Sequence, residues 1–171
     1  NSITDYALSG GADGILFDGT NDYIEVPYYK DAFQPTTSDM TVEYWVRPTF
    51  NTTNEWRGVL DYYQYSGTAS ARRGWRSYYY SDGTSYFESW GGNDSIQWTS
   101  GGTNIWEHHA FVWEGNKSTM YVNGVSVGSD VDGGEHAFPV TSSAILRIGL
   151  GTDGTGNANK YFQGYLDEIR F

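Results

Sequence analysis

Alternating apolar and polar residues run through the whole chain and predict β-strands. Residues 40–47, MTVEYWVR, alternate strictly and end at Pro48, which cannot donate a hydrogen bond to a strand ladder. Apolar residues at the spacing of a helix are nearly absent. Polar, glycine-rich stretches at residues 91–104 and 151–159 are predicted to be loops. The other strands are predicted at residues 14–17, 22–26, 58–63, 75–80, 84–90, 106–113, 118–122, 125–128, 144–149 and 161–171.

Turn residues predict which neighbouring strands form hairpins. Residues 19–21, Gly-Thr-Asn, are expected to join the first two strands. Asn123 and Gly124 both tolerate a positive φ, as a type I′ hairpin turn requires. Residues 81–83, Ser-Asp-Gly, are expected to form a three-residue loop with Gly83 in the left-handed conformation.

This last loop sets the pairing across the central hairpin, because side chains alternate between the two faces of a sheet. Arg76 would face Glu88, and Tyr78 would face Tyr86. The face assigned to the core carries Trp75, Ser77, Tyr79, Phe87 and Ser89. The face assigned to solvent mixes flat rings with charged groups and carries Arg76, Tyr78, Tyr80, Tyr86, Glu88 and Trp90.

Length and composition narrow the class of fold. At 171 residues the chain suits one compact unit, so residues 1–171 are expected to form a single domain. Aromatic residues make up 18% of the chain, and 22 glycines stand against 4 prolines, which is typical of an all-β sandwich or jelly roll. The chain opens at Asn1 rather than Met, and we expect it to be a module of a larger protein whose other domains are partners.

Charge excludes several classes of partner. The chain has 21 Asp and Glu against 10 Lys and Arg, a formal net charge of −11. A negative surface repels phosphate backbones and anionic membranes, so no nucleic-acid partner is expected. No stretch approaches the roughly 20 apolar residues of a membrane span, so membrane insertion is not expected either. The absence of cysteine excludes disulfides, thiol nucleophiles and thiolate metal sites.

Four segments, in the expected order and spanning most of the chain, resemble the laminin G-like and pentraxin-type domains of the concanavalin A-like lectin/glucanase superfamily. They are FDGTNDYIEV at 17–26, the strand 40–47 with Pro48, WEHH leading to MYVNG between 106 and 124, and LDEIR at 166–170. The resemblance implies a jelly-roll β-sandwich of two antiparallel sheets, often with one structural calcium ion, that binds glycans or protein surfaces. Because the same sandwich also hosts glycosidases and lyases, function depends on the site.

The two ends of the chain carry a candidate calcium (Ca2+) site. First and last strands commonly lie side by side in antiparallel sandwiches, and both carry hard oxygen ligands here. We predict side-chain ligands at Asp18, Asp22 and Asp167, with further oxygens from Gly19 and Asn21. In the alternative interpretation, Asp18 and Asn21 only shape the turn and Asp167 caps a nearby amide. The crowding of carboxylates, which calls for a counter-cation, and the family resemblance favour the ion.

Other candidate metal ligands are weaker. Asp130, Asp132 and Glu135 could take a second cation, but they lack tight ligand spacing, and a solvated loop is the simpler interpretation. His108 and His109 are adjacent on one predicted strand and therefore point to opposite faces, which argues against a shared metal site.

The solvent face of the central hairpin is the candidate ligand site. Aromatic rings cover the apolar C–H side of a pyranose, and charged groups bind its hydroxyls. Arg72, Arg73 and Arg76 concentrate positive charge beside the rings, which indicates an acidic or sulfated glycan. The alternative is that Tyr and Trp are simply good strand formers. The predicted ligand-binding residues are Trp56, Tyr63, Arg76, Tyr78, Tyr80, Tyr86, Glu88 and Trp90.

The leading hypothesis is a non-catalytic, lectin-like carbohydrate-binding module, stabilised by calcium and acting outside the cell. The second is a structural or adhesive domain of a virion or cell appendage whose aromatic face meets protein. The third is a glycoside hydrolase or lyase. The Glu-x-Asp-x-x-Glu pattern of related glycosidases is absent. Glu88 and Asp61 are the only carboxylates expected near the aromatic rings, and neither has a partner at the spacing that catalysis requires. The sequence therefore predicts no catalytic residues.

Overall fold

The computed structural model describes residues 14–27, 33, 39–49, 55–64, 73–90, 94–115, 117–131, 144–153 and 155–171. The strands form two six-stranded sheets and a two-stranded ribbon, and all their pairings are antiparallel. The terminal sheet, named for its first and last strands, has the order β1 (Ile15–Asp18), β14 (Gln163–Arg170), β3 (Met40–Pro48), β8 (Glu107–Glu114), β9 (Lys117–Val122) and β10 (Val125–Val131). The hairpin sheet has the order β2 (Ile24–Val26), β11 (Leu146–Ile148), β4 (Trp56–Gln64), β5 (Arg73–Tyr80), β6 (Thr84–Trp90) and β7 (Asp94–Thr99). The ribbon consists of β12 (Leu150–Thr152) and β13 (Ala158–Tyr161).

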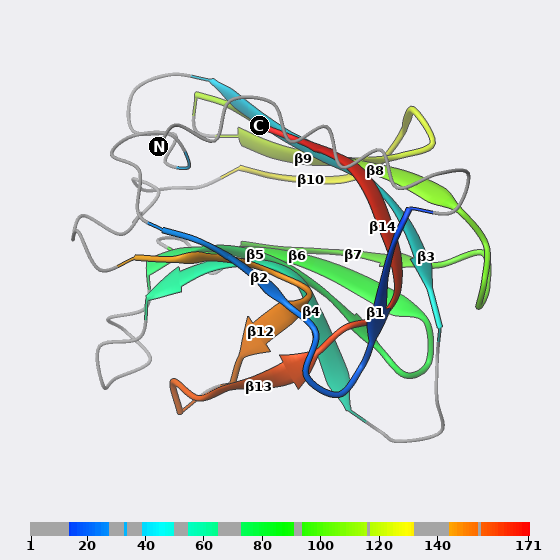
Figure 1. The fold of residues 1–171 in the computed structure, drawn as a ribbon. Coiled ribbons are helices and arrows are strands. Elements are labelled where there is room, and N and C mark those ends of the chain that lie inside the picture. Colours follow the sequence, from blue (N-terminus) through cyan, green and yellow to red (C-terminus); the bar gives the residue numbers. More distant parts are fainter. Residues whose placement is uncertain are drawn as a thin grey trace.

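The two large sheets lie face to face, and the β12–β13 ribbon lies on the side of the hairpin sheet away from the terminal sheet (Figure 1). This arrangement confirms the predicted all-β sandwich of two antiparallel sheets. Among the described residues no helix is long and apolar enough to cross a membrane.

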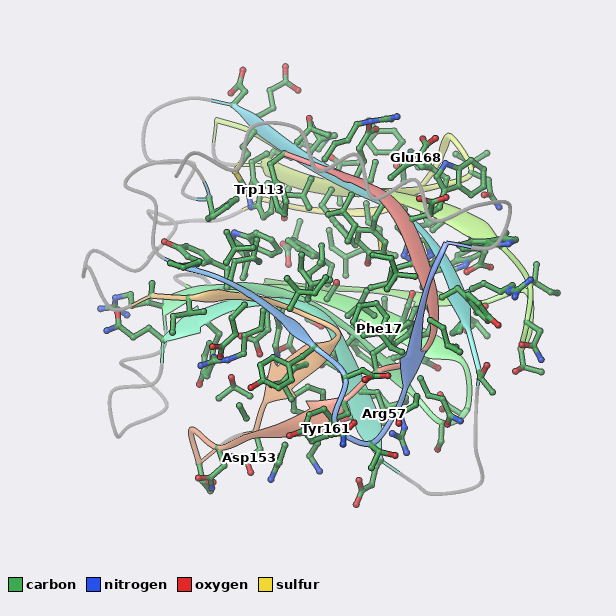
Figure 2. All side chains as sticks on the ribbon, viewed as in Figure 1. Phe17, Arg57, Trp113, Asp153, Tyr161 and Glu168 are labelled. Atoms are coloured by element: carbon green, nitrogen blue, oxygen red, sulfur yellow. The ribbon has the colours of Figure 1, made fainter. Side chains whose placement is uncertain are left out.

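Aromatic side chains from both sheets fill the core. Phe87 of the hairpin sheet stacks on Phe111 of the terminal sheet, with ring centroids 4.0 Å apart, and Trp75 meets Trp113 at 5.9 Å. Figure 2 shows Phe17 and Trp113 in the space between the sheets. All five side chains are buried, so the predicted alternation of inward apolar residues produces the core it implies.

The first and last strands pair, as predicted, with Ile15 opposite Leu166. The predicted hairpin between residues 14–17 and 22–26 is wrong. β1 pairs with β14 in the terminal sheet, whereas β2 pairs with β11 in the hairpin sheet. Residues 19–23 therefore carry the chain from one sheet to the other, which a local turn signal does not distinguish from a hairpin loop.

The other turn predictions have mixed outcomes. Gly83 has a φ of 87°, and Asn123 and Gly124 have φ values of 50° and 77°, so both predicted hairpin turns are confirmed. Residues 91–104 were predicted to be a loop but contain β7, and residues 151–159 contribute to the ribbon. Both missed segments are short and polar, and they become strands because a neighbouring strand satisfies their backbone groups.

Candidate functional site

Five charged side chains of alternating sign form a row across the outer face of the hairpin sheet. From β2 to β6 the row reads Glu25, Arg147, Asp61, Arg76 and Glu88, each opposite the next in the strand register. Arg147 Nε donates to Glu25 Oε1 over 3.1 Å. Arg76 donates to Glu88 Oε2 through Nε at 3.0 Å and through Nη2 at 2.8 Å. Each charge in the interior of the row therefore lies between two opposite charges.

Asp61, at the centre of this charge row, is fully buried. Its Oδ2 accepts a hydrogen bond from the Thr152 N–H over 2.6 Å, while Oδ1 has no hydrogen-bond partner among the described residues. Burial raises the pKa of Asp61 to about 6, although the hydrogen bond from Thr152 and the charges of Arg76 and Arg147 oppose the shift. The buried carboxyl thus titrates well above its usual range.

The β12–β13 ribbon covers this part of the sheet because two glycines permit close approach. A Cβ at Gly58 would lie 2.3 Å from the Gly151 backbone, and one at Gly151 would lie 2.5 Å from the Trp56 ring. Asp153 lies at the far end of the ribbon (Figure 2). Its Oδ1 accepts hydrogen bonds from the N–H groups of Thr155 and Asn157. The ribbon therefore packs directly on the backbone of β4, and no side chain intervenes at the Gly58 contact.

Beside the charge row, four rings form a cluster centred on Tyr78. Tyr78 stacks on Tyr86 with centroids 5.1 Å apart and planes 3° from parallel, and Trp56 meets Tyr78 at 5.0 Å. Tyr80 contacts Tyr86 edge-on at 5.3 Å. The Tyr78 hydroxyl donates to Glu88 Oε1 over 2.6 Å, and burial together with the Glu88 charge raises the pKa of Tyr78 well above its usual value.

The rings and the charge row meet at Arg76. Its guanidinium carbon lies 4.6 Å from the centroid of Trp56, 4.8 Å from that of Tyr78 and 5.7 Å from that of Tyr63. The predicted pairing of Arg76 with Glu88 and of Tyr78 with Tyr86 is confirmed. The structure thus brings seven of the eight predicted ligand-binding residues into one network. The eighth, Trp90, ends β6, but its side chain lies outside the described residues.

The prediction that this face lies open to solvent is only partly right. Tyr63 and Tyr78 are 5% exposed, and Arg76 is covered on the side of the ribbon, where its Nη1 donates to the Thr152 carbonyl over 3.0 Å. The accessible part consists of Tyr80, Tyr86 and the carboxylate of Glu88, beside the exposed Ser95 and Gln97 of β7. The sequence did not reveal that the ribbon covers this part of the face, because the approach of Gly151 to Gly58 is a tertiary contact.

The five predicted calcium ligands do not gather around one point. Asp18 lies opposite Gln163, so Asp167 stands four residues further along β14, about 13 Å away at the rise of a strand. Asp167 Oδ1 instead accepts from the Glu168 N–H over 2.9 Å. Among the described residues no group of three or more acidic or histidine side chains could hold a metal ion. The set does not fit a single ion.

The turn at the end of β1 uses its oxygens internally. Asp18 Oδ1 accepts from the N–H groups of Thr20 at 2.7 Å and Asn21 at 3.3 Å, and Asp22 Oδ2 accepts from the Asp18 N–H at 3.0 Å. The Gly19 carbonyl accepts from Arg57 Nη1 at 3.2 Å. These contacts match the alternative interpretation of Asp18 and Asn21 as turn formers. Of the second acidic cluster, Asp130 lies in β10 opposite Ser118, whereas Asp132 and Glu135 lie outside the described residues.

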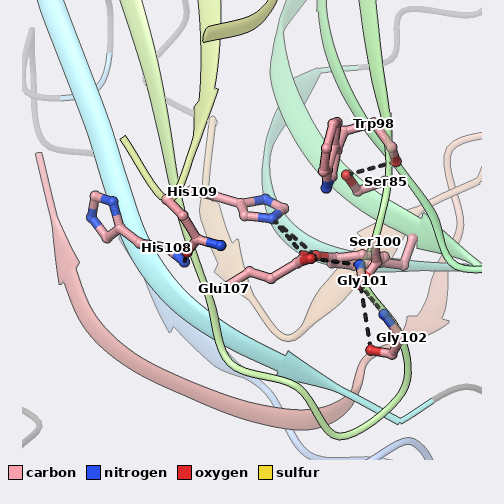
Figure 3. Close-up of polar contacts among 10 residues, drawn as sticks. Ser85, Trp98, Ser100, Gly101, Gly102, Glu107, His108 and His109 are labelled. Carbon is pink, nitrogen blue, oxygen red and sulfur yellow. Dashed lines mark hydrogen bonds and ion pairs between the residues drawn. The ribbon is translucent and has the colours of Figure 1, made fainter. Parts of the chain in front are cut away.

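A buried polar network lies between the sheets, and its residues were not predicted as a group (Figure 3). His109 Nε2 lies 3.2 Å from Glu107 Oε2 and 3.1 Å from the Tyr79 hydroxyl, and the Gly101 N–H donates to Glu107 Oε1 over 2.7 Å. Burial lowers the pKa of His109, so this ring is neutral at neutral pH. As predicted, His108 points to the opposite face, 3.5 Å from Glu43. Through the Gly101 N–H, this network links the loop after β7 to the core.

The two antiparallel sheets define a jelly-roll sandwich of the concanavalin A-like type. The chain belongs to the family Laminin_G_3, described as the concanavalin A-like lectin/glucanases superfamily, whose model matches residues 18–171. The family resemblance seen in the sequence is thereby confirmed. A search of curated proteins found no significant match.

Several solved structures share the fold at low sequence identity. The carbohydrate-binding module CBM40 of the Ruminococcus gnavus IT-sialidase, bound to alpha2,3 sialyllactose, has a TM-score of 0.63 and 12% identity, over 92% of this chain and 89% of that one. Domains LG4-5 of the mouse laminin alpha1 chain have a TM-score of 0.59 and 16% identity, over 92% of this chain and 40% of that one. Two variants of HCR/D are also similar, with TM-scores of 0.63 and 0.64 and 12% identity over 90% of this chain, which spans 37% and 38% of their length.

Proposed function

We propose that the chain is a non-catalytic carbohydrate-binding module and that a sugar lies on the accessible part of the hairpin sheet's outer face. The observation that carries the proposal is the anchoring of Glu88, whose two oxygens are held by Arg76 and the Tyr78 hydroxyl beside the Tyr80 and Tyr86 rings. The rings offer apolar surface for the C–H side of a pyranose, and the oriented carboxylate accepts hydrogen bonds from its hydroxyls. A fixed acceptor next to flat rings costs little entropy on binding.

The similarity to a CBM40 module bound to sialyllactose supports a glycan as the partner class. Whether the glycan is acidic is a finer proposal. Arg76, one of the three arginines on which the acidic-glycan prediction rests, already donates to Glu88 and to the Thr152 carbonyl. On this face a neutral sugar therefore has the better fit, since Glu88 supplies acceptors for hydroxyls. In line with the family, we propose that the module acts outside the cell.

The carboxylate geometry supports a binding role over glycoside hydrolysis. Asp61 and Glu88 lie on β4 and β6 with β5 between them, so their strands are about 10 Å apart. Retaining glycosidases need two carboxyl groups about 5 Å apart. Asp61 is also buried beneath the ribbon, and Arg76 stands between the two. Among the residues that the structure describes, Asp61 and Glu88 therefore form no carboxylate pair that would support the third hypothesis, an enzyme.

A glycan array or a polysaccharide retardation gel tests the proposal. Binding by the wild type should weaken about tenfold or more in Tyr86→Ala and in Glu88→Gln, because each removes a central contact. Tyr121→Ala, on the outer face of the terminal sheet, is the matched control and should bind normally. All variants need the melting temperature of a folded protein. Absence of binding to every glycan would sink the proposal and favour the structural or adhesive alternative.

A further inference from the structure

Arg47, on the outer face of the terminal sheet, contacts two aromatic rings. Its guanidinium carbon lies 4.1 Å from the centroid of Tyr165, its cross-strand neighbour on β14, and 5.4 Å from that of Trp106. The two rings are themselves 6.4 Å apart. The planes of the two rings are inclined by 58°, so they form a corner around the guanidinium. Contact with both rings restricts its orientation before any ligand arrives.

The Arg47 side chain has no hydrogen bond or ion pair with any residue that the structure describes, and its Nε is buried without a partner. Other arginines of the described part are engaged. Arg57 donates to the carbonyls of Gly19 and Tyr161, while Arg147 and Arg170 bind Glu25 and Glu43. In a chain with 21 acidic residues and 10 basic ones, an arginine without an acidic partner is unexpected.

The nearby acidic side chains are turned to other partners. Asp167 lies opposite Trp45, two register positions beyond Arg47, and accepts from the Glu168 N–H. Glu43 lies two positions further along β3 from Trp45 and is held by Arg170 and His108. Among the residues that the structure describes, no acceptor therefore competes for the charge of Arg47, although the residue keeps part of its surface exposed.

Apolar side chains frame the same spot. Trp45, two residues before Arg47 on the same face of β3, is 37% exposed, and Leu16, opposite Tyr165 on β1, is 56% exposed. A ligand that places an anionic group on Arg47 would rest its remaining surface on these side chains. A guanidinium matches a planar carboxylate, and an indole ring matches the C–H side of a pyranose.

We propose that Arg47 is a second ligand site, which binds the carboxylate of an acidic sugar while Trp45 and Leu16 contact the sugar ring. This site lies on the opposite outer face of the sandwich from Glu88 and does not depend on the function proposed for the hairpin sheet. It also provides a place for the acidic glycan that Arg76, already engaged, does not accommodate.

Arginine Nε–H NMR signals of the folded protein, titrated with sodium glucuronate and with glucose, test the proposal. A single charge-assisted contact with ring packing implies a Kd on the order of 1 mM. We expect a saturable shift of the Arg47 signal, assigned by its loss in Arg47→Lys, with glucuronate but not with glucose. By isothermal titration, affinity should fall about tenfold in Arg47→Lys and severalfold in Trp45→Ala.

Arg170→Lys, on the same face but paired with Glu43 and Glu168, is the matched control and should retain wild-type affinity. If glucuronate shifts the Arg76 signal and leaves the Arg47 signal unchanged, the acidic sugar binds at the hairpin sheet and the proposal is overturned. Unchanged affinity in Arg47→Lys would overturn it as well. An equal response to acetate and to glucuronate would exclude the sugar contact with Trp45.

Discussion

Asp61 and Arg76 face each other across β4 and β5, and the backbone of Thr152 binds both of them. The Thr152 N–H donates to Asp61 Oδ2 over 2.6 Å, and its carbonyl accepts from Arg76 Nη1 over 3.0 Å. One peptide segment of the ribbon therefore satisfies a buried anion and a neighbouring cation at once. The ribbon becomes part of the ligand face, because it fixes Arg76, which in turn orients Glu88.

Asp61 should make the folded state less stable as pH rises from about 4 to about 6. Its pKa is raised from its usual value to about 6 on folding, so the folded state binds the proton more tightly. This stabilising contribution is fully present below about pH 4 and is lost as pH rises through 6. In Asp61→Asn it disappears, and the difference in unfolding free energy between wild type and variant should change by on the order of 2 kcal/mol across this range.

Urea unfolding of both proteins at several pH values measures this difference. The subtraction removes other titrating groups that the variant shares with the wild type. Parallel stability curves for wild type and Asp61→Asn would show that Asp61 has an ordinary pKa and is not desolvated by the ribbon.

Gly151→Ala should lift the ribbon from the sheet. The new Cβ would lie 2.5 Å from the Trp56 ring and 3.0 Å from Gly58 Cα, so β12 must move. Overpacking of this kind costs about 1–3 kcal/mol, and the Thr152 amide, which donates to Asp61, should exchange its hydrogen faster. Gly101→Ala is the control, since its Cβ would meet only Glu107 Oε1 at 3.4 Å. Unchanged exchange at Thr152 would contradict the close packing.

Glu107→Gln should destabilise the fold. Glu107 accepts from the Gly101 N–H and contacts both His109 and the Tyr79 hydroxyl in a buried site. An amide offers one acceptor oxygen in place of two, so it cannot accept from the Gly101 N–H on one side and from the Tyr79 hydroxyl on the other. Because His109 is neutral, the loss is that of hydrogen bonds to a charged acceptor in a buried site, which costs about 1–3 kcal/mol and is measurable by urea unfolding. Glu114→Gln, exposed at the end of the same strand, should stay within about 0.5 kcal/mol of wild type.

Calcium stays a prediction, and the structure changes which variants test it. If calcium stabilises the fold, a chelator should lower the melting temperature of the wild type. This effect should be lost in Asp22→Asn, since Asp22 lies in the turn with Asp18. The same dependence should survive Asp167→Asn, because Asp167 stands four positions along β14 from the residue that faces Asp18. If the chelator leaves the melting temperature of the wild type unchanged, the calcium prediction is wrong. If Asp167→Asn also abolishes the effect of the chelator, that result would contradict the strand register.

The sequence predicted the central hairpin well because its information is local. A glycine in the left-handed conformation after Ser81 and Asp82 sets the loop length, which then pairs Arg76 with Glu88 and Tyr78 with Tyr86. The alternation of Trp75 and Phe87 with polar neighbours assigned their face to the core, where both are buried.

Long-range neighbours were harder to predict. Arg147, between Leu146 and Ile148, has the pattern of an outward residue, yet nothing near it in the sequence shows that Asp61 and Glu25 lie on either side. Arg47 likewise has the pattern of an outward residue in the alternating strand 40–47. The rings that contact it belong to Trp106 and Tyr165, which lie far along the chain.

By itself the sequence determined the all-β class, the main strands, the inward faces and the two tight hairpins, because periodicity and turn chemistry act over a few residues. Only the tertiary structure decided which strands became neighbours across the sheets. That choice separated Asp167 from Asp18, covered Asp61 with the ribbon and left Arg47 without an acidic partner among the described residues. Pairing between distant strands depends on the packing of the whole core, and a short stretch of sequence does not encode it.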